Sequence, residues 1–217
     1  MQTTNGAWQR NMVEFIQPAS RLISYKGDRT KSEDWYQTIT LSAFAHNARN
    51  KENYNFFYQS IYCCNKMIEA MADSPVDQTF KNEIEGEAKL IRAINYFSLT
   101  RYYGDVPLII NTPKNVDETD APRTLYIEVY KQILKDLEYA EQNMRTPERQ
   151  AQISGMTGRP HKGAATAFKA AVYAQIACII ENKDYYFFDL SKRPDAAPDF
   201  SSVGINTAED AWKLALS

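Results

Sequence analysis

Cysteine and histidine, which often form covalent frameworks, metal sites and catalytic centres, are scarce in this sequence. Its 217 residues include 3 cysteines and 2 histidines. Cys63 and Cys64 are adjacent and cannot bridge comfortably within a helix, so a disulfide framework is excluded. We predict that all three cysteines are buried as small apolar side chains. His46 and His161 lie far apart and outside any metal-binding motif, so no metal site is expected.

Motifs for catalysis and cofactor binding are also missing. The sequence contains no G-x-S-x-G elbow, no Walker loop and no G-x-G-x-x-G turn. Carboxylates are plentiful, but we expect Glu83, Glu85 and Glu87 to be solvated residues near the start of a helix. The protein is therefore not expected to be an enzyme, to use catalytic residues or to hold a cofactor.

Long apolar runs and a strong charge imbalance are absent as well. No stretch approaches the ~20 apolar residues of a membrane span, and residues 1–15 lack the basic and apolar regions of a signal peptide. The formal net charge is −2. We therefore expect no binding to nucleic acid or to an anionic membrane surface.

Apolar residues recur at helical spacing along most of the chain. This pattern predicts helices over residues 54–72, 79–103, 125–144 and 161–182, and a last helix that opens at Thr207 with a capping box. The third helix is the most regular, with Tyr130, Ile133, Leu137, Ala140 and Met144 inside and Lys131, Lys135, Asp136 and Glu141 outside. The predicted fold class is all-α, with antiparallel helix pairs stacked like tetratricopeptide repeats and long irregular loops between them.

The segment from Gly86 to Ile110 is the most informative part of the chain. Its apolar residues cover two sides of a helix, which indicates that neighbours bury this helix almost fully. Gly104 can adopt the left-handed conformation that ends a helix, and Pro107 prevents the helix from continuing. The sequence therefore predicts a buried helix, a sharp corner and an extended apolar run.

Four segments carry a resemblance to a known family. The first contains Glu87, Arg92–Ala93, Tyr96–Phe97 and Tyr103–Leu108, and it resembles a motif of the SusD/RagB family. Arg123–Ala140, Gly158–Ala174 and, more loosely, Trp35–Ile68 resemble three further helices of that family. The four matches occur in the family's order across residues 35–180, so the chain is identified as a member.

The resemblance implies an architecture and a role. Members have a helical-repeat scaffold and a large irregular C-terminal portion, so residues 1–217 are expected to be a single N-terminal helical-repeat domain, truncated at its C-terminus. Members are nutrient-binding lipoproteins on the extracellular face of the outer membrane of Bacteroidetes-type bacteria. The resemblance implies that this chain binds an oligosaccharide and delivers it to a SusC-like TonB-dependent transporter. Membrane contact is expected only through a lipid anchor outside this chain.

Candidate ligand residues lie in two of the four expected loops, which cover about residues 25–53, 104–123, 145–160 and 183–206. Sugars present apolar faces and hydroxyl rims, which aromatic rings and polar side chains can bind. The first loop contains Asp34, Trp35 and Tyr36, and the last contains Tyr185 and Tyr186. Two alternatives stay open: Trp35 could anchor the core at the start of the next helix, and residues 185–188 could be a hydrophobic plug.

Two functions fit these features. The first is non-catalytic glycan binding at the cell surface, as the resemblance implies. The alternative is a helical-repeat scaffold for protein–protein interaction that binds a peptide or protein ligand. Arg92 belongs to the resembling motif, yet we expect it to make a structural hydrogen bond or to pack on an aromatic ring.

Overall fold

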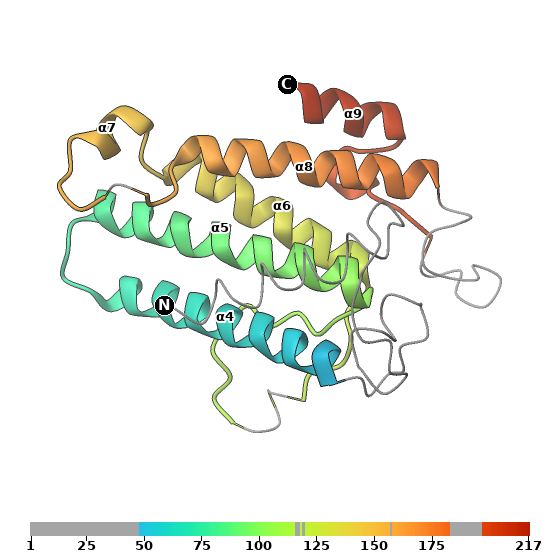
Figure 1. Ribbon diagram of the computed structural model, residues 1–217, viewed down its shortest axis with the longest axis horizontal. Helices are drawn as coiled ribbons and strands as arrows, with labels where there is room; N and C mark the ends of the chain where they lie inside the picture. The colour runs from blue at the N-terminus through green and yellow to red at the C-terminus, as the bar shows by residue number, and fades with distance from the viewer. Residues whose placement is uncertain (1–47, 116–117, 119, 157, 183–196) are drawn as a thin grey trace, which may run out of the picture. The chain divides into compact units, whose positions relative to one another are not determined.

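The computed structural model describes residues 48–115, 118, 120–156, 158–182 and 197–217 (Figure 1). They form α4 (Ala48–Asp73), α5 (Gln78–Tyr103), α6 (Tyr126–Asn143), α7 (Pro147–Ala151), α8 (Lys162–Glu181), the 3-10 helix η4 (Ser201–Val203) and α9 (Ala208–Leu216). These residues contain two isolated β-bridges and no strand, so the all-α prediction is confirmed. The chain divides into two compact units, 1–56 and 57–217, and the contacts described below lie within the second.

Most helix boundaries follow signals that the sequence contains. The carboxylate of Asp77 accepts a hydrogen bond from the Phe80 amide and caps α5, which ends at Gly104 with a φ of 66°. The predicted capping box of α9 is present, because Thr207 and Asp210 bond to each other's backbone amides. Helix α4 begins earlier than predicted, at Ala48 rather than residue 54.

The corner after α5 also starts the next helix. The carboxylate of Asp105 accepts a hydrogen bond of 3.0 Å from the Tyr126 amide, which satisfies a free donor in the first turn of α6. Beside it, Val106 and Thr124 exchange two backbone hydrogen bonds in an antiparallel bridge. Leu125 itself provides no side-chain cap to α6. The short motif Gly104-Asp105-Val106 therefore ends one helix and positions the beginning of another.

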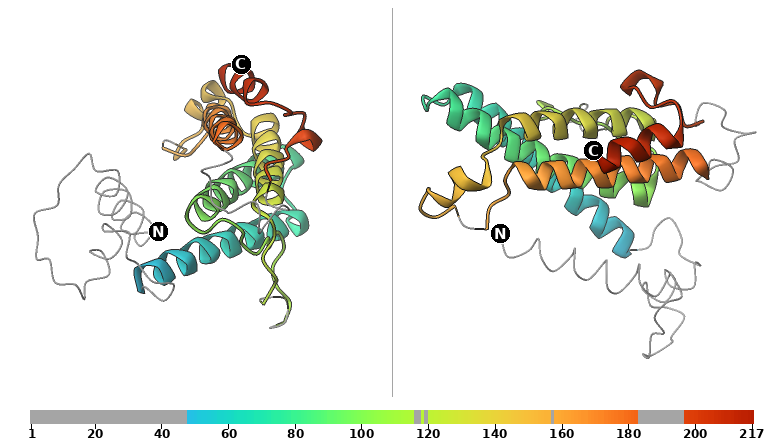
Figure 2. Two further views of the ribbon diagram at one scale, coloured as in Figure 1. Left: turned by 90° about the vertical axis from the view of Figure 1, so that its right-hand side faces the viewer. Right: turned by 90° about the horizontal axis from the view of Figure 1, so that it is seen from above.

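The core lies where α5, α6 and α8 meet, and Figure 2 shows these helices from two further directions. Its largest fully buried side chains include Tyr96, Leu99, Tyr130, Ile133, Leu137, Met144, Ile176 and Ile179. Helix α5 has buried residues on two sides, as predicted, but Ile91 and Tyr102 are each 42% exposed, so the expectation of nearly full burial is wrong at these positions.

Helix α8 differs from what the sequence led us to expect. It is 20 residues long and contains a window of mean hydropathy 1.4, so by length and composition alone it could cross a membrane. Its alanines, its isoleucines and Val172 give it this composition. The prediction that no segment approaches an apolar membrane span therefore does not hold for α8. A core helix meets the same criterion, and α8 packs on α6 and α9 with Val172, Ile176 and Ile179 buried.

The cysteines differ in exposure. Cys64 is buried and Cys178 is half-buried, whereas Cys63 is exposed, so the prediction that all three are buried is wrong for Cys63. Neighbouring residues of a helix point in directions about 100° apart. Cys64 therefore faces the core of this unit while Cys63 points away from it. Burial raises the pKa of the Cys64 thiol to about 12.

Substitution of Gly86 tests the close approach of α5 and α6. A Cβ atom at Gly86 would lie 2.7 Å from Cγ of the buried Met144. We expect Gly86→Val to lower the free energy of unfolding by about 2 kcal/mol through overpacking. The control is Ala167→Val at an exposed position of α8, which should cost about 0.5 kcal/mol through helix propensity. Urea unfolding measures both, and equal losses would contradict the close approach.

Alkylation of the folded protein tests the two cysteine environments. Iodoacetamide at pH 8 should label Cys63 and leave Cys64 unmodified, because the Cys64 thiol is buried and stays protonated. Peptide mass spectrometry identifies the labelled residue. Labelling in urea is the control, and all three cysteines should then react. Equal rates at Cys63 and Cys64 in the folded protein would show that the orientation of α4 is wrong.

Candidate functional site

The residues that the sequence nominates for ligand binding lie outside the described residues. Asp34, Trp35 and Tyr36 precede Ala48, and Tyr185 and Tyr186 fall between residues 182 and 197. Their role stays a prediction. The same holds for the expectation of a single truncated domain with four loops. Two buried polar clusters and a pocket lie within the described residues.

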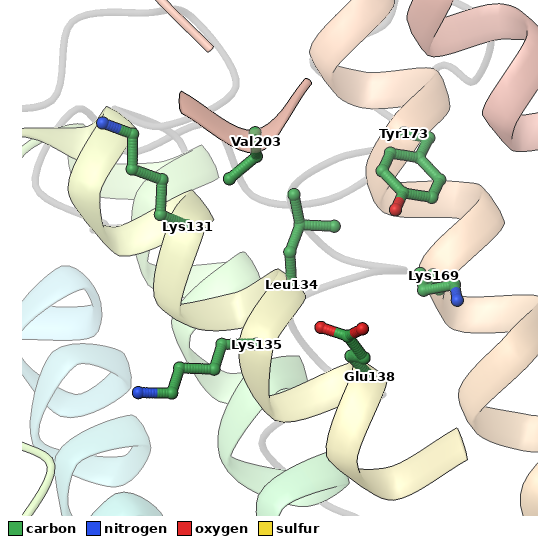
Figure 3. Close-up of a pocket in the computed structure, with 7 residues that line it drawn as sticks. All are labelled: Lys131, Leu134, Lys135, Glu138, Lys169, Tyr173 and Val203. Atoms are coloured by element: carbon green, nitrogen blue, oxygen red, sulfur yellow. The ribbon is translucent and has the colours of Figure 1, made fainter. Parts of the chain in front are cut away.

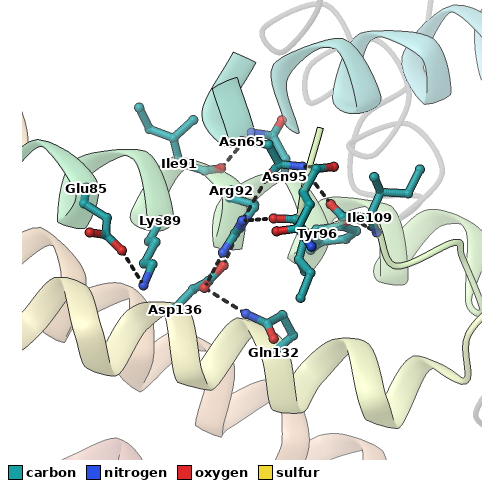
Figure 4. A network of polar contacts seen from close by, with 12 residues as sticks. Asn65, Glu85, Lys89, Ile91, Arg92, Asn95, Tyr96, Ile109, Gln132 and Asp136 are labelled. Carbon is teal, nitrogen blue, oxygen red and sulfur yellow. Dashed lines mark hydrogen bonds and ion pairs between the residues drawn. The ribbon is translucent and has the colours of Figure 1, made fainter. Parts of the chain in front are cut away.

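The first cluster is centred on Arg92 of α5 (Figure 4). Its guanidinium donates two hydrogen bonds of 2.8 Å to the two carboxylate oxygens of Asp136 on α6. The same group donates to the side-chain oxygen of Asn65 on α4 and to the backbone oxygen of Ile110. Burial alone would lower the pKa of Arg92, but the hydrogen bonds and charge of Asp136 outweigh burial and raise it. The predicted structural hydrogen bond of Arg92 is confirmed.

An extended segment, residues 106–112, lies against this cluster. The Asn65 amide donates to the backbone oxygens of Ile109 and Asn111, at 3.0 and 3.1 Å. The Tyr96 hydroxyl donates to the Ile109 carbonyl and accepts from the Ile109 amide. The Tyr58 hydroxyl donates to the Pro107 carbonyl. Side chains of α4 and α5 thus bind the backbone of this segment much as a protein binds an extended peptide.

The second cluster lies at the other end of α5. The guanidinium of Arg145 donates to both Glu83 and Glu87, and all three side chains are buried. Each glutamate also pairs with a partly exposed arginine: Glu83 with Arg149 at 2.6 Å and Glu87 with Arg159 at 2.9 Å. The cluster attaches residues 145–159 to the start of α5.

These clusters correct two predictions. Glu83 and Glu87 were expected to be solvated, but they are 3% and 5% exposed. Asp136 was expected on the outer face of its helix, but it is 2% exposed. In each case an arginine from a distant part of the chain supplies the partner that a buried carboxylate requires. Periodicity within one helix carries no information about such partners.

A pocket of about 310 Å³ lies between α6, α8 and η4 (Figure 3). Its lining residues are Lys131, Leu134, Lys135, Glu138, Lys169, Tyr173 and Val203. In the close-up, Leu134 and Val203 lie near the middle of the group and the Tyr173 ring lies across from them on α8. The volume falls at the lower end of the range for small-molecule sites.

The wall that Val203 contributes is fixed by its neighbours. Phe200 and Ile205 are buried, and their backbones pair in a β-bridge around η4. The Phe200 ring packs edge-on against Tyr130 of α6, with ring centroids 5.9 Å apart. Gly204 takes a φ of 77° to close this turn. Contacts within the protein therefore hold the η4 wall of the pocket in place.

Charges of both signs surround the pocket. Lys131 pairs with Glu128, and Lys169 pairs with Glu141. Burial alone would raise the pKa of Glu141, but hydrogen bonds from Lys169 and Thr166 outweigh it and lower the pKa. Burial and the carboxylates of Glu138 and Glu141 raise the pKa of Tyr173. The charge of Lys169 acts in the opposite direction but does not outweigh them. Its phenol is neutral at physiological pH and can both donate and accept a hydrogen bond.

Sequence reasoning did not nominate these pocket residues for ligand binding. Lys131, Lys135 and Glu138 have the outward spacing of ordinary solvated residues on α6, and Tyr173 follows no binding motif. Val203 belongs to the expected loop at 183–206, which is the one available signal. Among the residues that the structure describes, no group of three or more histidine, cysteine, aspartate or glutamate side chains could hold a metal ion.

Comparisons with known proteins agree on one family. The family model described as starch-binding and associating with the outer membrane matches residues 2–174. A SusD-like protein of Formosa agariphila is 32% identical over 129 residues, which are 55% of this chain and 24% of the relative.

Solved structures give the same result. The crystal structure of a SusD-like protein from Bacteroides fragilis superposes with a TM-score of 0.64 at 25% identity, covering 82% of this chain and 35% of that one. A laminarin-binding SusD-like protein has a TM-score of 0.61 at 22% identity, with coverage of 73% and 35%. The matched region thus spans about a quarter to a third of the length of these proteins.

Removal of the charge on Asp136 tests the Arg92 cluster. Asp136→Asn leaves the buried guanidinium of Arg92 without its ionic partner, so we expect a loss of about 3–5 kcal/mol in the free energy of unfolding. The control is Glu209→Gln, which removes an exposed ion pair with Lys213 and should change stability by less than about 1 kcal/mol. Similar unfolding midpoints for the two variants would show that the cluster contributes little.

Proposed function

The chain belongs to the SusD-like family, and from this premise we propose that it binds glycans at the cell surface without catalysis. The observation that carries the proposal is the match of the starch-binding, outer-membrane-associating family model to residues 2–174. The names of related structures agree with it, since one is a carbohydrate-binding protein from Bacteroides fragilis and another binds laminarin.

Delivery to a transporter and attachment to the membrane belong to the same proposal. In it, a lipid anchor holds the protein on the extracellular face of the outer membrane. The protein passes its oligosaccharide to a SusC-like TonB-dependent transporter. Because the matched region covers only part of its relatives' length, further residues outside it can complete the ligand contacts and the transporter interface.

The alternative, a scaffold that binds peptides, has less support in the described residues. Helical-repeat scaffolds often bind an extended peptide between helices. Here residues 106–112 of the chain itself lie across α4 and α5. They occupy the hydrogen-bonding groups of Asn65, Arg92 and Tyr96 that a peptide backbone would need. A peptide could bind there only by displacing this segment.

Affinity electrophoresis tests the proposed function, with protein purified from the cells that produce it naturally. Gels that contain starch, laminarin or xyloglucan should retard the protein in at least one case, and gels without polysaccharide give the reference mobility. Mild detergent extraction should recover a TonB-dependent transporter together with the protein. Unchanged mobility in every gel, together with the absence of a transporter from the extract, would contradict the proposal.

A further inference from the structure

The pocket between α6, α8 and η4 has the features of a carbohydrate subsite. An aromatic ring, Tyr173, stands beside an apolar patch formed by Leu134 and Val203. A pyranose ring has an apolar C–H face that can pack on such a ring, and hydroxyl groups around its rim. The Glu138 carboxylate comes from α6 and the Tyr173 ring from α8, and the charge of Glu138 raises the pKa of the tyrosine.

Charge balance identifies the class of sugar. An anionic ligand would meet Glu138, while Glu128 and Glu141 already neutralise two of the three lysines. Neutral hydroxyl groups meet no such opposition, because each can donate to a carboxylate and accept from an ammonium or phenol group. The lining therefore favours a neutral polyhydroxylated ligand over an anionic one.

The directions of the side chains agree with this choice. In Figure 3 the ammonium groups of Lys131 and Lys135 point away from Leu134 and Tyr173. The aliphatic parts of these lysines therefore line the pocket, and their charges are directed away from it. The Glu138 carboxylate and the Tyr173 hydroxyl lie among the lining residues, and both can accept hydrogen bonds from sugar hydroxyls.

We propose that this pocket is a subsite that binds one end of a neutral glycan, with Tyr173 packing on a sugar ring and Glu138 accepting its hydroxyl groups. The subsite rests on the proposed glycan-binding function and gives that function a location on the scaffold. Val203 closes the wall opposite α8.

Calorimetry of the 217-residue chain tests the subsite with three probes: maltoheptaose, laminarihexaose and the anionic hexagalacturonate. We expect binding of at least one neutral probe and at least about tenfold weaker binding of hexagalacturonate. For the neutral probe, Tyr173→Ala should raise Kd about tenfold, because it removes the packing surface. Glu138→Gln keeps the shape and loses the charged acceptor, so it should raise Kd about tenfold as well.

The matched control is Tyr62→Ala, which removes an exposed tyrosine on α4, outside the pocket, and should leave Kd unchanged. Circular dichroism checks that each variant is folded. If Tyr173→Ala does not fold, Glu138→Gln alone tests the subsite. Wild-type Kd in Glu138→Gln, or preference for hexagalacturonate, overturns the subsite. The subsite is also overturned if the 217-residue chain binds no neutral probe while the protein isolated from cells is retarded in polysaccharide gels. In that case the proposal of glycan binding still stands. Unchanged mobility of the protein from cells would instead count against glycan binding itself.

Discussion

The buried ion pair between Arg92 and Asp136 is the contact on which the arrangement of the helices depends. It joins α5 to α6, and the same guanidinium also holds Asn65 of α4 and the carbonyl of Ile110. Two charges removed from water are costly unless every donor and acceptor is satisfied. The geometry of four segments is therefore fixed together, since displacing any one of them would leave a buried charge or carbonyl without its partner.

The residues that carry the family resemblance are mostly those that make such contacts. Glu87 meets Arg159, which is 72 residues further along the chain and belongs to a different resembling segment. Gly104 ends α5, and Asp105 caps α6. These motifs describe how the scaffold is held together, which explains why they identify the family and leave the ligand unnamed. The pocket uses side chains from the same helices on another face.

Local patterns predicted the helices but failed for their buried charges. Asp77, Gly104 and Thr207 act through neighbours a few residues away, so their roles follow from the sequence. Asp136 and Glu83 meet arginines 44 and 62 residues away, and nothing within one helix indicates those partners. The pocket could not be predicted for the same reason, because Tyr173 and Glu138 come together only when α6 and α8 pack.

Hydrogen exchange of an Arg92→Met variant tests most directly whether one side chain holds these segments together. Methionine keeps much of the apolar length of arginine and removes its four hydrogen bonds. Faster exchange is predicted in three places at once: α5 around residue 92, α6 around Asp136, and residues 106–112. Faster exchange around residue 92 alone, with α6 and residues 106–112 protected as in the wild-type protein, would contradict the central role of Arg92.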